Sequence, residues 1–541
     1  MTDFFRKKHI SQVLPNESTH DSLKRNLNVI DLTAFGIAAI VGAGIFSTIG
    51  SACNSGGPAV VFLFIFTAIA STFSAFCYAE FATRVPVSGS AYTYAYVTFG
   101  EIIAWVIGWA LLMEYSIGNI AVAISWSGYF TGLLSNVGIN FPTWLSTDYF
   151  TAKAGLTQEA TQAWLTAPNI GFRLILDLPA LVVNALITWL VYIGIKESKT
   201  FSNAMVVIKI MVILLVIFVG FFYIDTANYT PFAPNGMGGV MSSVAAVFFA
   251  YIGFDAISTT AEECHNPQKD LPRGMMYSLI ICTVLYILIA LVLTGMVNYK
   301  FLKVDDPLAF VFSKVGVNWI SGVISVSALV AMTSVLLVFQ MGQPRIWLSM
   351  SRDGLLPPAF AKIHPTYKTP SFSTIVTGFV VGVPILFLNY DFVIAFTSIG
   401  TLFAFVLVCG GVLLLPKRPK EIGRFNMPNL GSKYIVPPVF LLALAFLYFY
   451  VPNFFGSLLV FEGVNAANNV SLIVFLLLCS AISVFCFLKN WQLIPVLGLI
   501  SCFYLLTGMT PNNWLWFLVW FGIGLVIYFS YSYKKSKLHN K

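Results

Sequence analysis

The stretch Ala-Ile-Val-Gly-Ala-Gly-Ile-Phe, residues 39–46, interrupts a long apolar segment at its middle. A second apolar segment is interrupted in the same way by Phe-Phe-Ala-Tyr-Ile-Gly-Phe-Asp, residues 248–255. Each segment is long enough to cross a bilayer, which takes roughly 20 residues. A backbone break at mid-bilayer is costly unless the freed amide and carbonyl groups bind something polar. The paired breaks therefore predict two discontinuous membrane helices that share one polar site, the pattern of a secondary transporter with an inverted repeat.

The composition indicates an integral membrane protein. Apolar residues make up 58% of the 541-residue chain and charged residues only 10%, far from the balance of a soluble domain. Apolar runs recur from residue 29 almost to the C-terminus, which predicts an all-α protein with about fourteen transmembrane helices. The polar stretch 1–28 lacks the apolar region of a signal peptide, so none is expected.

The basic residues predict the orientation of the chain. With the N-terminus inside, most lysines and arginines fall in inner loops and in the tail, whereas the outer loops hold only Lys153, Arg173, Lys300, Lys303 and Lys314. This asymmetry predicts that both termini are cytoplasmic. The net charge of +8 is then a topological signal and does not indicate nucleic-acid binding.

The chemistry of the breaks predicts a zwitterionic ligand. The half-helix that begins after Gly44 offers free N–H groups and a positive dipole end to a carboxylate. The half-helix that ends near Ile40, with the carbonyls of Phe249 and Ala250, offers acceptors to an ammonium group. An α-amino acid carries both charges a short distance apart. The alternative is that Gly42 and Gly44 serve a close helix–helix contact.

Two ionisable residues lie deep inside expected spans. Lys209 is central in its segment, and burial disfavours the charged form of a lysine, so this residue can exchange a proton. A static ion pair with Glu114 or Asp255 is the alternative. Glu114 is equally central in the third span, where it is a candidate partner of Lys209, a proton relay or a contact for a cationic substrate side chain.

Other polar and reactive residues have simpler interpretations. Asp255 is expected to face the cytoplasmic vestibule or to cap the second half-helix, and Glu80 to pair with Arg84. The inner loop 84–96 is either an interfacial helix or an ordinary connection. The eight scattered cysteines are expected to be buried apolar residues. No HExxH motif or Ser/His/Asp set is present, so neither an enzyme nor a metal or cofactor site is expected.

Several motifs resemble the cationic amino acid transporter family, bacterial type, of the amino acid-polyamine-organocation superfamily. They lie in the same order as in that family and cover about residues 25–415. The motifs are GAGIF (42–46), CYAEF (77–81), RVPVSGSAY (84–92), FDAISTTAEE (254–263), NPQKDLP (266–272), PRI (344–346) and DGLLP (353–357).

The resemblance implies a five-plus-five inverted repeat core with broken spans 1 and 6. Residues 29–415 would form this ten-helix core, with repeats at about 29–223 and 237–415. Residues 1–28 would be a cytoplasmic segment, 416–533 would add helices 11–14, and 534–541 would be a basic cytoplasmic tail.

The resemblance also implies residue roles. The substrate would be lined by Ile40, Val41, Gly42, Ala43, Gly44, Ile45, Phe249, Ala250, Tyr251 and Ile252. Tyr251 would add a hydroxyl to this pocket. Lys209 would replace a sodium ion for proton coupling, held by the first break and by Thr333 or Ser334.

The expected function is proton-coupled symport of an L-amino acid across the plasma or inner membrane. The alternatives are a proton-independent facilitator or exchanger of cationic amino acids, and an amino acid sensor without transport. The expected partners are the amino acid, a proton and the lipid bilayer, with a small membrane subunit as a further candidate. The sequence leaves the choice between cationic and neutral substrates open, and it does not predict an oligomeric state.

Overall fold

The computed structural model describes residues 6–8, 27–84, 90–155, 157–169, 171–194, 199–415, 425–451, 453–459 and 466–538. Over these ranges the chain is helical with connecting turns, and it contains isolated β-bridges but no strand. This confirms the all-α prediction. Residues 9–26, 85–89, 416–424 and 539–541, which belong to the predicted N-terminal segment, an inner loop, the start of the extension and the tail, lie outside the described residues.

Seven helical segments of the described chain are long and apolar enough to cross a membrane, and an eighth results if the bent pair α10 (Gly236–Ser242) and α11 (Val244–Phe249) is one span. The seven contain the following helices: α3 (Val60–Arg84), α5 (Glu101–Asn136), α12 (Pro267–Met296), α14 (Asn318–Arg352), α16 (Tyr390–Leu414), α19 (Ala466–Lys489) and α21 (Pro511–Ile527).

The remaining apolar helices contribute shorter apolar segments of 10–17 residues, which in α9 is Met205–Phe221. They are α1 (Val29–Ile40), α8 (Leu178–Tyr192), α9 (Lys199–Phe221), α15 (Ser371–Ile385), α17 (Val436–Tyr450) and α20 (Leu493–Thr507). Every expected span thus contains a helix, in agreement with the prediction of about fourteen transmembrane helices, although only seven of the described helical segments are long and apolar enough to cross a membrane by themselves. An α-helix rises 1.5 Å per residue, so a helix such as α1 covers only part of a bilayer by itself.

Short helices and turns complete the chain. The short α-helices are α2 (Ile49–Gly56), α4 (Ser90–Thr98), α6 (Tyr149–Ala154), α7 (Gln158–Thr166), α13 (Pro307–Lys314), α18 (Phe454–Leu458) and α22 (Tyr533–Lys535). The 3-10 segments are Gly57–Ala59, Thr143–Leu145, Thr226–Tyr229, Phe254–Glu263, Tyr299–Phe301 and Pro358–Ala361, and the π-helical turns are Gly44–Thr48 and Tyr528–Ser532.

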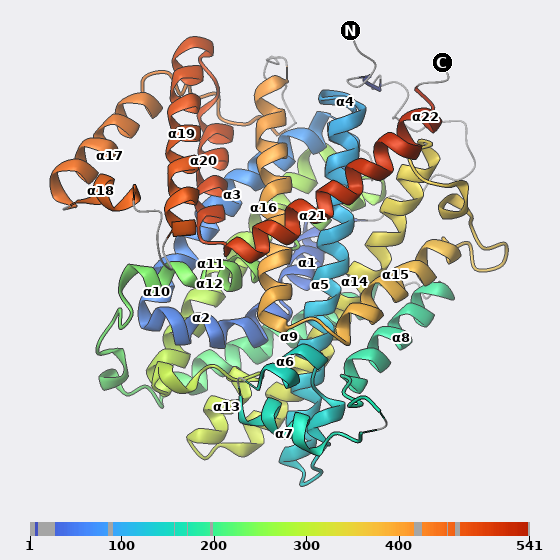
Figure 1. Ribbon diagram of the computed structural model, residues 1–541, viewed down its shortest axis with the longest axis vertical. Helices are drawn as coiled ribbons and strands as arrows, with labels where there is room; N and C mark the ends of the chain where they lie inside the picture. The colour runs from blue at the N-terminus through green and yellow to red at the C-terminus, as the bar shows by residue number, and fades with distance from the viewer. Residues whose placement is uncertain are drawn as a thin grey trace.

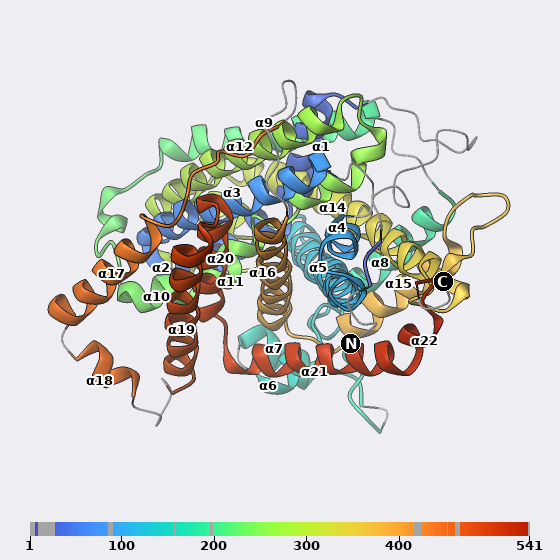
Figure 2. The same ribbon diagram turned by 90° about the horizontal axis from the view of Figure 1, so that it is seen from above.

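The core is built around α5. This helix packs most extensively against α14 and α16, while α3 packs on α12, and nearly all of the apolar part of α5 is buried. Figure 1 shows α5 and α16 running along the long axis of the molecule, with α21 crossing them obliquely. Figures 1 and 2 place α17 and α18 at the periphery, beyond α19 and α20.

Both ends of the described chain lie at the same end of the molecule. The guanidinium of Arg6 lies 5.2 Å from the ring centroid of Tyr533, close to α22. The predicted helix in the inner loop forms as α4, and its Tyr92, Tyr94 and Tyr96 are buried against other helices.

Candidate functional site

The first helix break lies where the sequence predicts it. The α1 helix begins with a capping box, in which the Asn28 side chain accepts from the backbone of Asp31 and the Asp31 side chain accepts from that of Asn28. The helix ends at Ile40, since Val41 adopts an extended conformation with φ −80° and ψ 93°. The chain resumes as the π-helical turn from Gly44, so the break spans Val41 to Ala43.

The break leaves a row of backbone donors. Among the hydrogen bonds of the described residues, the N–H groups of Gly42, Ala43 and Gly44 have no acceptor, whereas those of Ile45 and Phe46 donate to the Gly42 carbonyl. Three successive N–H groups at the start of a helix form a favourable environment for an anion. The arrangement can therefore hold a carboxylate, as the sequence predicts from the same glycines.

The carbonyls at the end of α1 are held by side chains of the protein. The Tyr286 hydroxyl donates to the Ile40 carbonyl at 3.1 Å, and Lys209 Nζ donates to the Val41 carbonyl at 3.2 Å. The carbonyls near Ile40 were expected to bind the substrate ammonium, and Tyr286 was not expected there. An isolated tyrosine in the apolar run of α12 gives little signal, because only the fold shows what its hydroxyl meets.

The second break also forms, and it packs directly on the first. The α11 helix ends at Phe249, and Gly253 has φ +120°, a conformation that favours glycine. A Cβ on Gly253 would lie 2.9 Å from the backbone of Ala39, and one on Gly44 would lie 2.4 Å from the Cα of Ala250. The alternative of a glycine-mediated helix contact therefore holds for Gly44 in this conformation. It coexists with the free N–H groups of the break.

The predicted lining residues are all brought together and buried. These are Ile40, Val41, Gly42, Ala43, Gly44 and Ile45 from the first break, and Phe249, Ala250, Tyr251 and Ile252 from the second. One detail is wrong: the Tyr251 hydroxyl donates to the Phe64 carbonyl of α3 at 3.1 Å, so it is held there and does not add a donor to a pocket. The Phe249 carbonyl likewise accepts the Ile252 N–H at 3.2 Å.

Lys209 is fully buried and bonds to the elements that were expected to hold it. Its Nζ donates to the Ala38 carbonyl at 3.1 Å and to the Val41 carbonyl at 3.2 Å, both of α1 and the first break. It also donates to Ser334 Oγ of α14 at 2.6 Å. Of the two candidates in the eighth span, Ser334 is the partner, while the Thr333 hydroxyl accepts from Trp126. Lys209 thus bridges α9, α1 and α14 through neutral oxygens.

The carboxylates of Glu114, Asp255 and Glu80 lie in different surroundings. Glu114 of α5 is buried within electrostatic range of Asp255, and its Oε2 has no hydrogen-bond partner among the described residues. Asp255 is buried near the start of the 3-10 segment, two residues after Gly253. The capping role expected for Asp255 stays a prediction. Glu80 pairs with Arg84 at 2.8 Å, as expected, and the eight cysteines are buried and unbridged.

An all-helical protein with several membrane-crossing helices and two interlocked helix breaks is a multi-pass membrane permease in its architecture. The chain belongs to the amino acid permease family, whose model matches residues 27–464. The match extends beyond residue 415, where the resemblance from sequence motifs ends.

The relatives that resemble this chain are permeases and transporters, and not enzymes. It is similar to the branched-chain amino acid permease BcaP of Bacillus subtilis (strain 168), with 39% identity over 537 residues that cover 99% of each chain. It is 37% identical over 540 residues to a methylthioribose transporter of the same organism, covering 100% of each chain. It is also 34% identical over 433 residues to cationic amino acid transporter 4, vacuolar, of Arabidopsis thaliana, covering 78% of this chain and 68% of the relative.

Proposed function

We propose that the protein is a secondary active transporter that carries an L-amino acid together with a proton across the plasma membrane by alternating access. Membership of the amino acid permease family supports amino acid transport. The free N–H groups of Gly42, Ala43 and Gly44 offer a place for the carboxylate of the substrate. The basic-residue asymmetry of the sequence supports an orientation with both termini in the cytoplasm.

The bridge made by Lys209 carries the proposal of proton coupling. A charged ammonium has three donors, and here they meet the Ala38 carbonyl, the Val41 carbonyl and Ser334 Oγ. This arrangement ties the first break to α14. Loss of the proton leaves a neutral amine with two N–H donors, so at least one of these contacts weakens. Protonation then biases the equilibrium between two arrangements of α1 and α14, and a differential affinity of about 1.4 kcal/mol shifts it tenfold.

The ammonium group of the substrate requires hydrogen-bond acceptors. Tyr286 and Lys209 already donate to the Ile40 and Val41 carbonyls, but a carbonyl oxygen has two lone pairs and can accept a second bond. We assign the substrate ammonium to this carbonyl end and to the carbonyls of the second break. Glu114 is a second candidate for the proton path, because its buried Oε2 has no partner within the described residues.

Uptake into proteoliposomes tests the proposal. Wild type should accumulate a radiolabelled amino acid when the outside buffer is more acidic than the lumen, and Lys209→Met should lose this accumulation at least tenfold while retaining exchange. Lys153→Met, which changes an exposed lysine, is the matched control. Accumulation by Lys209→Met equal to that of wild type would remove Lys209 from the coupling mechanism. Wild-type uptake that ignores the pH gradient would favour the alternative of a proton-independent facilitator or exchanger.

A competition panel identifies the substrate. The relatives are named for branched-chain amino acids, for cationic amino acids and for methylthioribose. Unlabelled leucine, lysine and methylthioribose would each compete with the labelled substrate if they share its site. The proposal of an amino acid substrate fails if only methylthioribose competes.

A further inference from the structure

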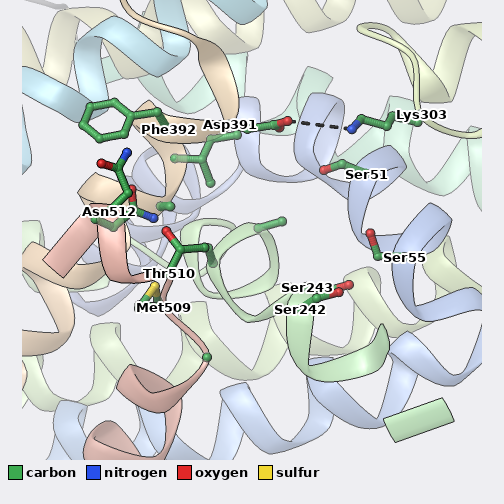
Figure 3. A pocket seen from close by; sticks show the side chains of 16 residues that line it. Ser51, Ser55, Ser242, Ser243, Lys303, Asp391, Phe392, Met509, Thr510 and Asn512 are labelled. Atoms are coloured by element: carbon green, nitrogen blue, oxygen red, sulfur yellow. Dashed lines mark ion pairs between the residues drawn. The ribbon is translucent and has the colours of Figure 1, made fainter. Parts of the chain in front are cut away.

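A cavity of about 360 Å³ with a mixed polar and apolar lining lies outside the helix breaks, between α2, the α10–α11 pair, the start of α16 and the connection from α20 to α21. Figure 3 shows Lys303 and Asp391 meeting on one side of it, with Phe392 and Asn512 beside Asp391 and a row of serines opposite. In the proposed orientation this cavity opens on the outer side. Its volume suits a small ligand, since ligand pockets are typically about 300–1,000 Å³.

The floor of the cavity is bonded to the first helix break. Ala245 and Ala246 of α11 line the floor, and the Ala246 carbonyl accepts a hydrogen bond from Thr48 Oγ1 at 3.0 Å. The same hydroxyl donates to the Gly44 carbonyl at 2.5 Å. The cavity wall formed by α11 is therefore hydrogen-bonded to the half-helix that follows the first break.

The rim of the cavity carries one charge of each sign. Lys303 Nζ lies 3.8 Å from Asp391 Oδ2, and both side chains are 63% exposed. An exposed ion pair of this kind contributes little to stability, so a ligand that brings its own two charges can replace it at little cost. Asp305 lies within electrostatic range of Asp391, which makes that side of the rim the more negative one and favours an ammonium there.

The walls of the cavity can contact the uncharged part of such a ligand. Phe392, Ile394, Ala395 and Met509 offer apolar contacts, Thr510 and Asn512 add polar groups beside Phe392 and Met509, and the serines lie across from them (Figure 3). Met509 belongs to the α20–α21 connection and Asn512 to the first turn of α21, so the helices after residue 415 take part in the cavity. An apolar wall with a few placed polar groups is the usual composition of a small-molecule site.

We infer that this cavity is a second, outer binding site for a free amino acid, whose carboxylate binds Lys303 and whose ammonium binds Asp391 before the molecule passes to the helix breaks. The inference rests on the proposed transport function for its direction of passage. The site itself is defined by the cavity and its charges. It makes the C-terminal helices part of substrate entry.

Protection of an engineered cysteine tests the outer site. Asn512 is exposed on the cavity wall, and all eight native cysteines are buried, so Asn512→Cys should be the main target of a charged thiol reagent. L-Leucine should slow labelling. Isopentylamine and 4-methylpentanoate, which lack the carboxylate and the ammonium respectively, should need at least tenfold higher concentrations. Adding Lys303→Gln and Asp391→Asn should raise the leucine concentration for half-protection by a similar factor, whereas the exposed Lys300→Gln should leave it unchanged.

A second measurement separates the outer site from the helix breaks. The protection assay is repeated with Gly44→Ala, in which the packing of the breaks is disturbed, and protection should persist. Uptake by Lys303→Gln/Asp391→Asn, with the breaks intact, should show a raised KM and an unchanged kcat. The inference is overturned if leucine protects the double variant as well as wild type, or if its KM is unchanged. Absence of uptake by wild type would instead refute the transport function, since protection at Asn512→Cys needs only binding.

Discussion

The absence of a side chain at Gly44 has two consequences for the first helix break. A Cβ at this position would come within 2.4 Å of the Ala250 Cα, and backbone cannot move aside as a side-chain tip can. Gly44 also contributes one of the three N–H groups without an acceptor among the described residues. The residue therefore serves both the contact between the breaks and the proposed carboxylate site.

Substitution of Gly44 by alanine should weaken amino acid binding at least tenfold. The added methyl group pushes the two breaks apart and misplaces the N–H groups, which lose their common direction. Equilibrium binding of radiolabelled substrate to purified protein checks this. Gly410→Ala is the control, because nothing lies within 4 Å of a Cβ at that position. Near wild-type binding by Gly44→Ala would contradict the assignment of the first break as the substrate site.

At the scale of single elements, the buried side chain of Asp177 caps the N-terminus of α8. Asp177 is buried, and its Oδ1 accepts hydrogen bonds from Ser127 Oγ at 2.6 Å and from the Ala180 N–H at 3.1 Å. Burial raises the pKa of Asp177 to about 7, although both hydrogen bonds oppose this change. The desolvation cost of the charge exceeds the benefit of its partners.

The raised pKa of Asp177 makes the stability of the fold depend on pH. Because the native state holds this proton up to about pH 7 and the unfolded state releases it near pH 4, native protein binds more protons between these values. Stability should therefore fall as the pH rises from about 4 to about 7. The melting temperature of wild type in detergent should be higher at pH 5 than at pH 8.

Asp177→Asn should lose part of this pH dependence. Asparagine can keep the cap, since its side-chain oxygen accepts the same bonds, but it does not titrate. A tenfold difference in proton affinity between the folded and unfolded states corresponds to about 1.4 kcal/mol of stability. The quantity compared is the slope of melting temperature against pH in wild type and in Asp177→Asn. Asp306, whose pKa burial also raises to about 7, titrates in both proteins, so part of the pH dependence remains in the variant. Identical slopes would show that Asp177 is not a source of the dependence.

At the scale of the whole molecule, both ends of the described chain are fastened to the same end of the bundle. Glu101 at the start of α5 is fully buried and accepts from Tyr528 at 3.2 Å and from Ser536, while Arg6 Nη2 lies 3.8 Å away. Nearby, Lys8 pairs with Asp353 at 2.6 Å. The C-terminal segment after α21 thus closes over α5 and the end of α14.

Removing the C-terminal donors to Glu101 should destabilise the protein. The double variant Tyr528→Phe/Ser536→Ala leaves the buried carboxylate with fewer partners, and each lost donor costs about 1–3 kcal/mol. The melting temperature should fall by several degrees, and protease should cleave the C-terminal tail faster. Tyr531→Phe, a nearby tyrosine without this contact, is the control. Equal stability of the variant and the control would show that the hydrogen bonds from Tyr528 and Ser536 to Glu101 do not contribute to stability.

The sequence by itself determined the helical class, the two breaks and the buried position of Lys209. Apolar length, glycine runs and a lone charge in an apolar run are local signals, because the cost of exposing backbone or charge to lipid arises at the residue concerned. The Glu80–Arg84 pair could be predicted for the same reason, because the two residues lie four positions apart along the chain.

Only the tertiary structure decided which groups meet across the chain. Tyr286 reaches the Ile40 carbonyl over 246 residues, and Tyr251 turns its hydroxyl to Phe64 over 187 residues, so no local pattern encodes either bond. The true lengths of the helices were also set by packing and by breaks, and not by apolar length alone. The outer cavity was not visible in the sequence, because its walls come from α2, α11, α16 and the α20–α21 connection, which only the fold brings together.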